Sequence, residues 1–153
     1  MNDTQLLLDR VSDQDLREAY QNRFTLKTGE VLDNSRKVAD HLATLLAGRT
    51  RETFIVCFLN RRNALLATEI LFEGTLTQAV IFPREIVKYA LLKNAAAIIC
   101  GHNHPSWEVN PSGDDQVLTR KIKAACKLVD IQLLDHVIIA GGNFFSFADK
   151  GIL

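Results

Sequence analysis

The pattern of apolar and polar positions predicts helices first and strands later in the chain. Ser12 and Asp15 form a Ser-x-x-Asp start before a short, weakly amphipathic helix at 16–20. A second helix is expected to begin at 34 or 35 and to end at 47, because apolar residues recur there at helical spacing and Gly48 follows as a stop. A polar connector separates the two helices.

From residue 53 the period changes to that of strands. Residues 54–59 are apolar at every position, which is typical of a central strand covered on both faces. A polar turn at 60–63 leads into a second predicted strand at 64–71, so the two form a hairpin. Pro83 then opens a helix whose apolar face is formed by Ile86, Val87, Ala90 and Leu91. A buried strand is expected at 95–100.

The last third of the chain repeats this alternation. A loop at 101–111 precedes a long helix that begins at Gln116 and has apolar positions as far as Val129. Strands are predicted at 133–140 and 144–147. The order β-β-α-β-α-β-β predicts an α/β fold in α-β-α layers, with a mixed β-sheet flanked by helices.

Composition and charge narrow the class of protein. The chain has 153 residues, of which 47% are hydrophobic and 24% are charged, which suits one globular domain with its own core. Because 18 Lys and Arg balance 18 Asp and Glu, the excess of positive charge needed for strong nucleic-acid binding is absent. No apolar run reaches the roughly 18–20 residues that cross a membrane, and no secretion signal precedes the first helix. A cytoplasmic protein is therefore expected.

Cysteine usage points the same way. Cys57, Cys100 and Cys126 are odd in number, widely separated and set among apolar neighbours. Free cysteine behaves as a small hydrophobic residue, so we expect three buried thiols in a reducing compartment.

The candidate chemistry lies after the strand at 95–100. His102 and His104 stand at i and i+2, which places two imidazoles on one side of an extended segment. Ten residues then separate His104 from Asp115, enough for a loop to return a carboxylate to the same point. Two imidazole nitrogens, one carboxylate oxygen and an open fourth position are what a catalytic zinc ion requires.

Each of these residues also has a simpler interpretation. Ser112-x-x-Asp115 is a capping box, in which both side chains satisfy backbone N–H groups at a helix start. The histidines could form a solvated loop pair. Asp114 competes with Asp115, and only the ten-residue spacing favours the latter.

These residues resemble the JAMM (MPN+) metalloprotease family, whose pattern is a Glu upstream, then His-x-His, ten residues and Asp, with Ser three residues before that Asp. His102, His104, Ser112 and Asp115 match it completely. A closer resemblance, to the bacterial RadC-like proteins, runs from about Ser35 to Leu153. It is carried by Glu52, Glu73-Gly74-Thr75-Leu76, Pro83-Arg84-Glu85, Asn94-Ala95-Ala96-Ala97, His102-Asn103-His104-Pro105-Ser106, Leu134-Asp135-His136 and Ser146-Phe147.

The resemblance implies a JAMM/MPN domain of deaminase-like architecture with Zn²⁺ as its metal. His102, His104 and Asp115 would be the zinc ligands. Glu52 would act as general base and then as acid, and Ser112 would donate a hydrogen bond to the oxyanion. The implied reaction is hydrolysis of a peptide or isopeptide bond in a peptide or protein substrate of unknown identity.

The chain departs from the RadC-like pattern in two places. Trp107-Glu108-Val109 stands where those proteins usually carry Gly-Asp, so the contacts at the mouth of the site should differ. Residues 1–33, expected to be an accessory segment before a domain at 34–153, are too few and too acidic for the DNA-binding helix-hairpin-helix region of longer relatives. The sequence therefore predicts a short form that lacks this region.

Several assignments stay open at this level. Glu69, Glu73 and Glu85 are rivals to Glu52 as the base. Asp135 and His136 are expected to form a hydrogen-bonded core pair, with a role behind the metal ligands left open. The competing function is a non-catalytic or DNA-repair-associated interaction module that keeps the metal-binding fold. A zinc deaminase is disfavoured because His-x-Glu and Pro-Cys-x-x-Cys are both absent.

Overall fold

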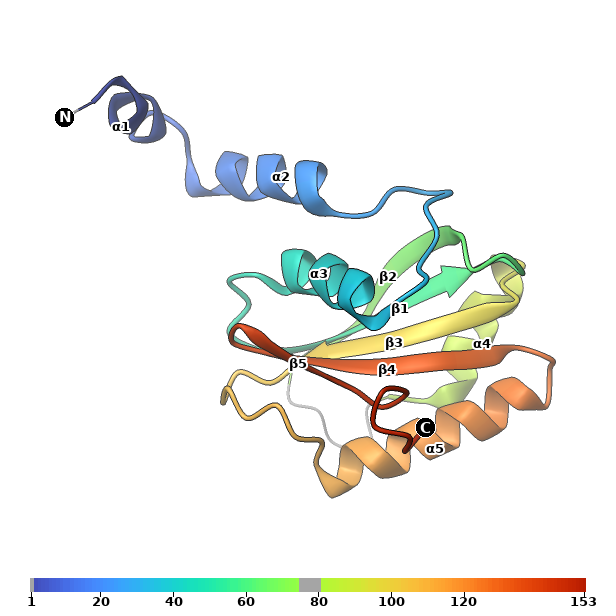
Figure 1. The fold of residues 1–153 in the computed structure, drawn as a ribbon. Helices are drawn as coiled ribbons and strands as arrows, with labels where there is room; N and C mark the ends of the chain where they lie inside the picture. The colour runs from blue at the N-terminus through green and yellow to red at the C-terminus, as the bar shows by residue number, and fades with distance from the viewer. Residues whose placement is uncertain (1, 75–80) are drawn as a thin grey trace.

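A mixed five-stranded sheet with helices on both faces forms the body of the protein (Figure 1). The computed structural model describes residues 2–74 and 81–153. Its elements are α1 (Asp3–Leu8), α2 (Asp13–Phe24), α3 (Ser35–Leu46), β1 (Glu52–Leu59), β2 (Leu65–Gly74), α4 (Pro83–Leu92), β3 (Ala97–Asn103), α5 (Gly113–Lys127), β4 (Gln132–Ala140) and β5 (Asn143–Ser146).

The strand order is β2-β1-β3-β4-β5. β1 pairs antiparallel with both β2 and β3, and β4 pairs antiparallel with β5. Only β3 and β4 are parallel, because α5 carries the chain back between them. The α/β class, the mixed sheet and the first hairpin predicted from the sequence are confirmed.

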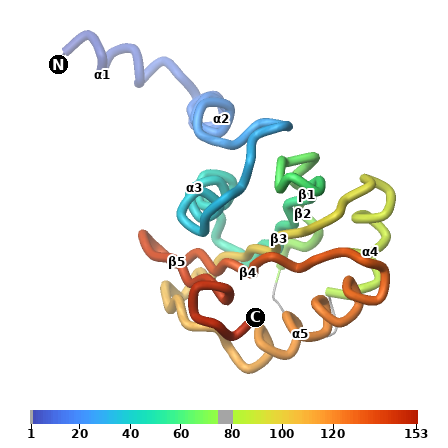
Figure 2. The backbone as a smooth tube through the Cα atoms, turned by 45° about the vertical axis from the view of Figure 1, so that its right-hand side comes forward, coloured from blue at the N-terminus to red at the C-terminus, as the bar shows by residue number. Residues whose placement is uncertain are grey.

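Alternate residues of β1 face opposite helix layers, which explains why this strand is apolar throughout. Ile55 and Cys57 pack under α3 with Leu42, whereas Phe54 and Phe58 face α4 and α5. Figure 2 shows α3 on one side of the sheet and α4 with α5 on the other. The core therefore consists of two apolar layers, one on each side of the sheet.

Some boundaries differ from those predicted. β3 continues to Asn103, past the predicted end at 100, because Gly101 pairs with both neighbouring strands. A Cβ atom at Gly101 would lie 2.4 Å from Leu42, so only glycine lets α3 approach the strand this closely. α5 begins at Gly113 rather than at 116, because Ser112 supplies the cap. His102 and Asp115 are consequently part of regular elements rather than of the connecting loop.

Two smaller predictions about side chains and thiols have mixed outcomes. On α4, Ile86 and Ala90 are buried as expected, but Leu91, which was placed on the same apolar face, is 53% exposed. All three cysteines are buried and free. Across residues 2–74 and 81–153, no helix combines the length and the apolar character that spanning a membrane demands.

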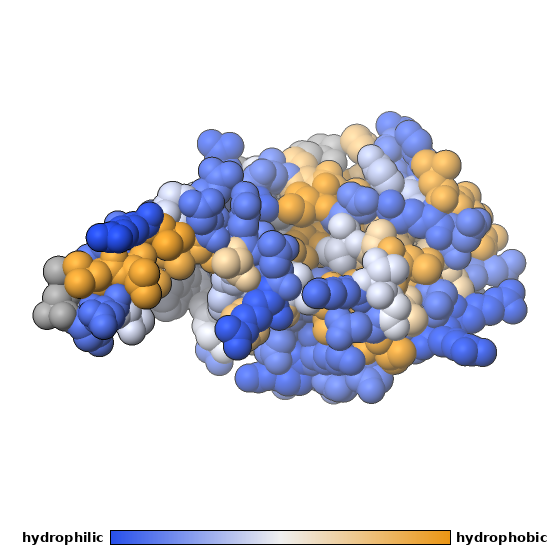
Figure 3. All heavy atoms as spheres, turned by 90° about the horizontal axis from the view of Figure 1, so that it is seen from above, coloured by the Kyte–Doolittle hydropathy of each residue, from blue (hydrophilic) through white to orange (hydrophobic). Residues whose placement is uncertain are grey.

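The N-terminal helices lie outside this core. Neither α1 nor α2 contains a buried residue, and apolar side chains remain on their surface (Figure 3). α2 packs mainly against α3. The segment that follows α2 was predicted as a polar connector, but it contributes Leu32 to the core. In the same segment, the Leu26 N–H donates to Nδ1 of buried His41 at 2.9 Å.

Candidate metal centre

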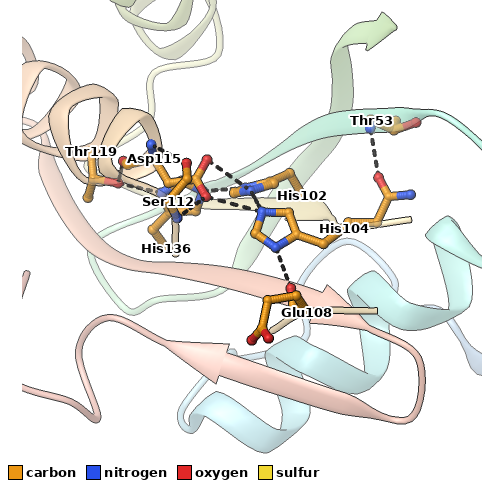
Figure 4. Close-up of polar contacts among 9 residues, drawn as sticks. Thr53, His102, His104, Glu108, Ser112, Asp115, Thr119 and His136 are labelled. Carbon is orange, nitrogen blue, oxygen red and sulfur yellow. Dashed lines mark hydrogen bonds and ion pairs between the residues drawn. The ribbon is translucent and has the colours of Figure 1, made fainter. Parts of the chain in front are cut away.

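The two histidines reach the site from the end of β3. His102 pairs with Phe54 of β1 and Ile138 of β4, so it is held in the middle of the sheet and is 1% exposed. His104 follows the strand, and its N–H donates to the Ile139 carbonyl at 2.8 Å. This keeps the backbone extended, and both imidazoles project to the same side (Figure 4).

Asp115 reaches the histidines from the first turn of α5. Its backbone N–H donates to Ser112 Oγ at 3.0 Å, and its Oδ2 accepts from the Ser112 N–H at 2.9 Å, so the capping box is present. The same carboxylate places Oδ1 3.3 Å from His102 Nε2 and Oδ2 3.1 Å from His104 Nε2. The cap and the contact with the histidines are thus two uses of one side chain. Asp114, its rival, is exposed.

Hydrogen bonds to Nδ1 of His102 and of His104 determine the tautomer of each ring, and therefore whether the Nε2 atom near Asp115 carries a lone pair. His104 Nδ1 lies 2.6 Å from the Glu108 carbonyl, which only accepts, so Nδ1 carries the hydrogen. Thr119 Oγ1 donates to the Asp115 carbonyl at 2.6 Å and therefore accepts from His136 Nδ1, also at 2.6 Å. His136 Nε2 is then the acceptor for His102 Nδ1 at 2.8 Å.

These bonds leave acceptor atoms pointing at one another. In the neutral imidazoles, Nε2 of His102 and Nε2 of His104 both carry lone pairs, yet they lie 3.0 Å apart beside an anionic carboxylate. Only a cation between them, a proton or a metal ion, makes this arrangement favourable. A tetrahedral zinc ion with bonds of about 2.1 Å separates its ligand atoms by about 3.4 Å, so these residues fit zinc with small adjustments.

With a proton in that position, the three groups behave as an ion pair. Burial alone would raise the pKa of Asp115, but hydrogen bonds from His102 and His104 outweigh it and hold the pKa well below its usual range. The hydrogen bond to Asp115 raises the pKa of His104, with a smaller contribution from the charge of Glu52. Burial lowers the pKa of His136 well below its usual value, which keeps this histidine neutral.

Glu52 is the first residue of β1, beside the cluster. The register pairs Phe54 with His102, and its continuation by two residues sets Glu52 opposite His104. Asn103 holds the strand on both sides of Glu52: its Oδ1 accepts from the Thr53 N–H at 2.7 Å and its Nδ2 donates to the Arg51 carbonyl at 3.0 Å.

Glu52 also lines an open pocket, and its rivals are engaged elsewhere. The pocket is lined by Thr50, Arg51, Glu52, Gly74, Pro105 and Ser106. Glu69 pairs with Lys93 at 3.0 Å, and Glu73 pairs with Arg49 at 2.9 Å. Glu85 lies in the first turn of α4 with Arg84 Nε 3.9 Å away. Of these four glutamates, only Glu52 has a negative charge that contributes to raising the pKa of His104.

Asp135 and His136 have separate roles despite being adjacent. Asp135 accepts from the His136 N–H at 2.7 Å, from the Ala148 N–H at 3.0 Å and from Ser146 Oγ at 2.5 Å. It therefore ties β4 to the C-terminal segment. His136 instead contacts His102 directly, so it is the member of the pair that can act on a metal ligand.

Three contributors were not anticipated from the sequence. Thr119 follows Asp115 by one helical turn, a spacing that could have suggested it. Asn103 alternates with the histidines, and its contacts with β1 depend on strand pairing. The Glu108 carbonyl has no sequence signal, because every residue carries one.

Comparisons with known proteins bear on this geometry. The model of the family described as "RadC-like JAB domain" matches residues 32–152. The chain belongs to the RadC-like JAB-domain family. The matched range contains the three converging residues, His102, His104 and Asp115, and also Glu52, Ser112 and His136.

Individual relatives agree with the family match. A UPF0758 protein of Nitrosomonas europaea is 45% identical over 128 residues, covering 84% of this chain and 57% of the relative. A UPF0758 protein of Acidovorax sp. (strain JS42) is 49% identical over 128 residues, 84% of this chain and 54% of the relative. One from Methylibium petroleiphilum is 50% identical over 123 residues, 80% and 55% respectively. The chain spans about half the length of these curated relatives.

Proposed function

We propose that this RadC-like protein is a zinc-dependent hydrolase of the JAMM type that cleaves a peptide or isopeptide bond. The observation that carries the proposal is the convergence of His102 Nε2, His104 Nε2 and the Asp115 carboxylate as acceptors, with both Nδ1 hydrogens directed away from the site. Three converging acceptors require a cation between them, and a metal ion held there is what a hydrolase of this type uses.

The proposed residue roles follow from position and hydrogen bonding. His102, His104 and Asp115 hold the metal; zinc in such a three-ligand site supplies Lewis acidity and lowers the pKa of a water molecule to about 7. Glu52 receives the proton of the attacking water and then delivers it to the leaving amine. Asn103 fixes the backbone on both sides of Glu52, so this carboxylate approaches from a rigid strand.

Ser112 is the proposed donor to the oxyanion. Its oxygen accepts from the Asp115 N–H, which uses a lone pair and leaves the hydroxyl hydrogen able to donate to a developing negative charge. The capping role thereby orients the oxygen, because the first turn of α5 holds it. One residue can serve both purposes without moving.

The test separates metal binding from turnover. Zinc content and hydrolysis would be measured for the wild type and for Glu52→Gln, with internally quenched peptides that contain α-peptide bonds or Lys Nε isopeptide bonds. We expect Glu52→Gln to keep zinc and lose turnover, His102→Ala to lose both, and Glu85→Gln, at an exposed helix start, to lose neither.

Two results would contradict the proposal. Unchanged turnover in Glu52→Gln would remove the assigned base. A wild-type protein that holds one zinc ion and cleaves none of the peptides would favour the interaction module as the function of this fold.

A further inference from the structure

Trp107 is unusual in both its backbone and its exposure. It is the only tryptophan in the chain and follows His104 by three residues. Its φ of 68° lies in the left-handed region, where a side chain is crowded by the backbone, and the residue is 77% exposed. A strained and exposed aromatic residue does little for folding, and such outliers gather at functional positions.

The surrounding loop holds this residue in one orientation. The Trp107 N–H donates to the His104 carbonyl at 3.1 Å, and the carbonyl of the next residue, Glu108, accepts from His104 Nδ1. Glu108 Oε1 in turn accepts from the N–H and the Nδ2 of Asn110, at 3.0 and 2.8 Å. The loop that presents the indole is thus bonded to a candidate metal ligand.

The indole rests against the turn that joins β4 to β5. A Cβ atom at Gly141 would lie 3.2 Å from Cε3 of the Trp107 ring, so a glycine with φ of 57° makes room for it. Two residues earlier, the Ile139 carbonyl accepts from the His104 N–H. The ring therefore contacts this turn beside the candidate metal centre, and most of its surface is open to a ligand.

The nearby charges indicate which ligand suits this surface. Glu108 adjoins Trp107, Asp114 lies in the first turn of α5 next to Asp115, and Glu52 lies across from His104. Arg51, in the pocket with Ser106, is a basic residue on this side. Carboxylates in this number repel phosphate groups, which disfavours stacking of nucleic-acid bases and favours an uncharged side chain.

We propose that Trp107 forms a binding subsite for a large apolar or aromatic side chain of a peptide segment that lies across the metal centre. A rigid, exposed indole offers a large contact area at little entropic cost, and aromatic pairs gain further from stacking. The proposal rests on the proposed peptidase function for the identity of the ligand, but binding itself requires no turnover.

The sole tryptophan makes the test direct. Zinc-loaded Glu52→Gln protein, which should not cleave, would be titrated with acetyl-Ala-Phe-Ala-amide, with acetyl-Ala-Gly-Ala-amide and with single-stranded oligodeoxythymidylate while indole emission is followed. We expect a saturable change with the Phe peptide only. Trp107→Gly should weaken Phe-peptide binding about 2- to 10-fold relative to the protein that keeps Trp107, as measured by NMR of the peptide ring protons.

Two controls separate the subsite from other roles. An indole moved to α4 by Tyr89→Trp in the Trp107→Gly background should not respond to the Phe peptide. Trp107→Gly should melt no lower than the wild type, since glycine adopts the left-handed backbone without strain.

An equal response to both peptides, a response to the oligonucleotide alone, or a melting temperature several degrees lower in Trp107→Gly would overturn the subsite. If the Phe peptide causes no change in indole emission while the wild type turns over normally, the subsite is refuted and the hydrolase stays intact. A Phe-peptide response together with no turnover by the wild type would support the subsite and refute the hydrolase.

Discussion

Two helix starts in this protein carry the same Ser-x-x-Asp motif and use it differently. At α2, Ser12 Oγ accepts from the Asp15 N–H at 3.1 Å and donates to Asp15 Oδ2 at 2.6 Å, and both residues are exposed. At α5, the same pattern in Ser112 and Asp115 closes a capping box, and the carboxylate also contacts His102 and His104.

The two helices also differ in their packing, and the packing decides what the carboxylate can contact. α2 buries none of its residues, whereas α5 buries Ile122 and Cys126 against the sheet, which brings its first turn to the end of β3. At α2 the Asp15 carboxylate accepts from the Ser12 hydroxyl, whereas at α5 the Asp115 carboxylate accepts from the Ser112 backbone N–H, so both starts carry a carboxylate at the third helical position. It becomes a candidate metal ligand only where tertiary packing sets it beside two imidazoles.

The largest expected effect is the loss of zinc affinity when the Asp115 carboxylate is neutralised, with the same change at Asp15 as the control. Asp115→Asn should weaken zinc binding by more than about 100-fold, because losing even a group that merely orients a ligand costs about 10- to 100-fold. Asp15→Asn should bind zinc as the wild type does. Competition with a chromophoric chelator measures both, and equal affinity in the two variants would end the distinction drawn between the motifs.

Asp115 is buried and Asp15 is exposed. Because His41 is also buried but lies outside the candidate site, replacing it tests whether burial of a polar group is by itself enough to affect zinc binding. Burial lowers the pKa of His41 to about 4, from 6.5. As pH falls below 6.5, the unfolded chain takes up this proton and the folded protein does not, so stability is lost down to about pH 4.

The size of this effect is of order 3 kcal/mol. We expect His41→Gln to lose this part of the pH dependence in urea unfolding while zinc affinity stays unchanged. A weakened zinc site in His41→Gln would show that buried polar groups far from the cluster also support it.

A smaller effect is expected from the hydroxyl behind His136. Thr119 and Thr44 are both buried helical threonines that donate to the carbonyl four residues earlier, at 2.6 and 2.8 Å, but only Thr119 also contacts His136. Thr119→Val should weaken zinc binding about 10- to 100-fold by releasing His136 and hence His102. Thr44→Val is the matched control, and similar losses in both would indicate a general packing defect.

The smallest effect belongs to the caps themselves. Ser112→Ala should lower the free energy of unfolding by about 1 kcal/mol, since α5 belongs to the core. Ser12→Ala should change global unfolding by less than this, because α2 can fray while the sheet stays folded. Urea unfolding with hydrogen exchange of the α2 amides distinguishes the two; equal global losses would place α2 in the cooperative core.

Sequence reasoning succeeded where a signal is local or periodic. The apolar run at 54–59, the turn at 60–63 and the caps at Ser12 and Ser112 each depend on neighbouring residues, and the structure has all of them. The choice of Asp115 over Asp114 followed from spacing to His104, which a loop of given length nearly determines. Leu91 was misplaced because helical periodicity gives a face but not the width of the surface that covers it.

The sequence by itself determined the strands and most of the helices, the alternation that buries β1 on both faces, and the residue types that can bind zinc. These follow from backbone preferences and from side-chain chemistry, which act over a few residues. Tertiary structure decided that His136 and Thr119 fix the tautomer of His102, and that Asn103 holds the strand around Glu52. Hydrogen bonds between residues 17–52 positions apart exist only once the sheet and α5 have packed together, so no local pattern could encode them.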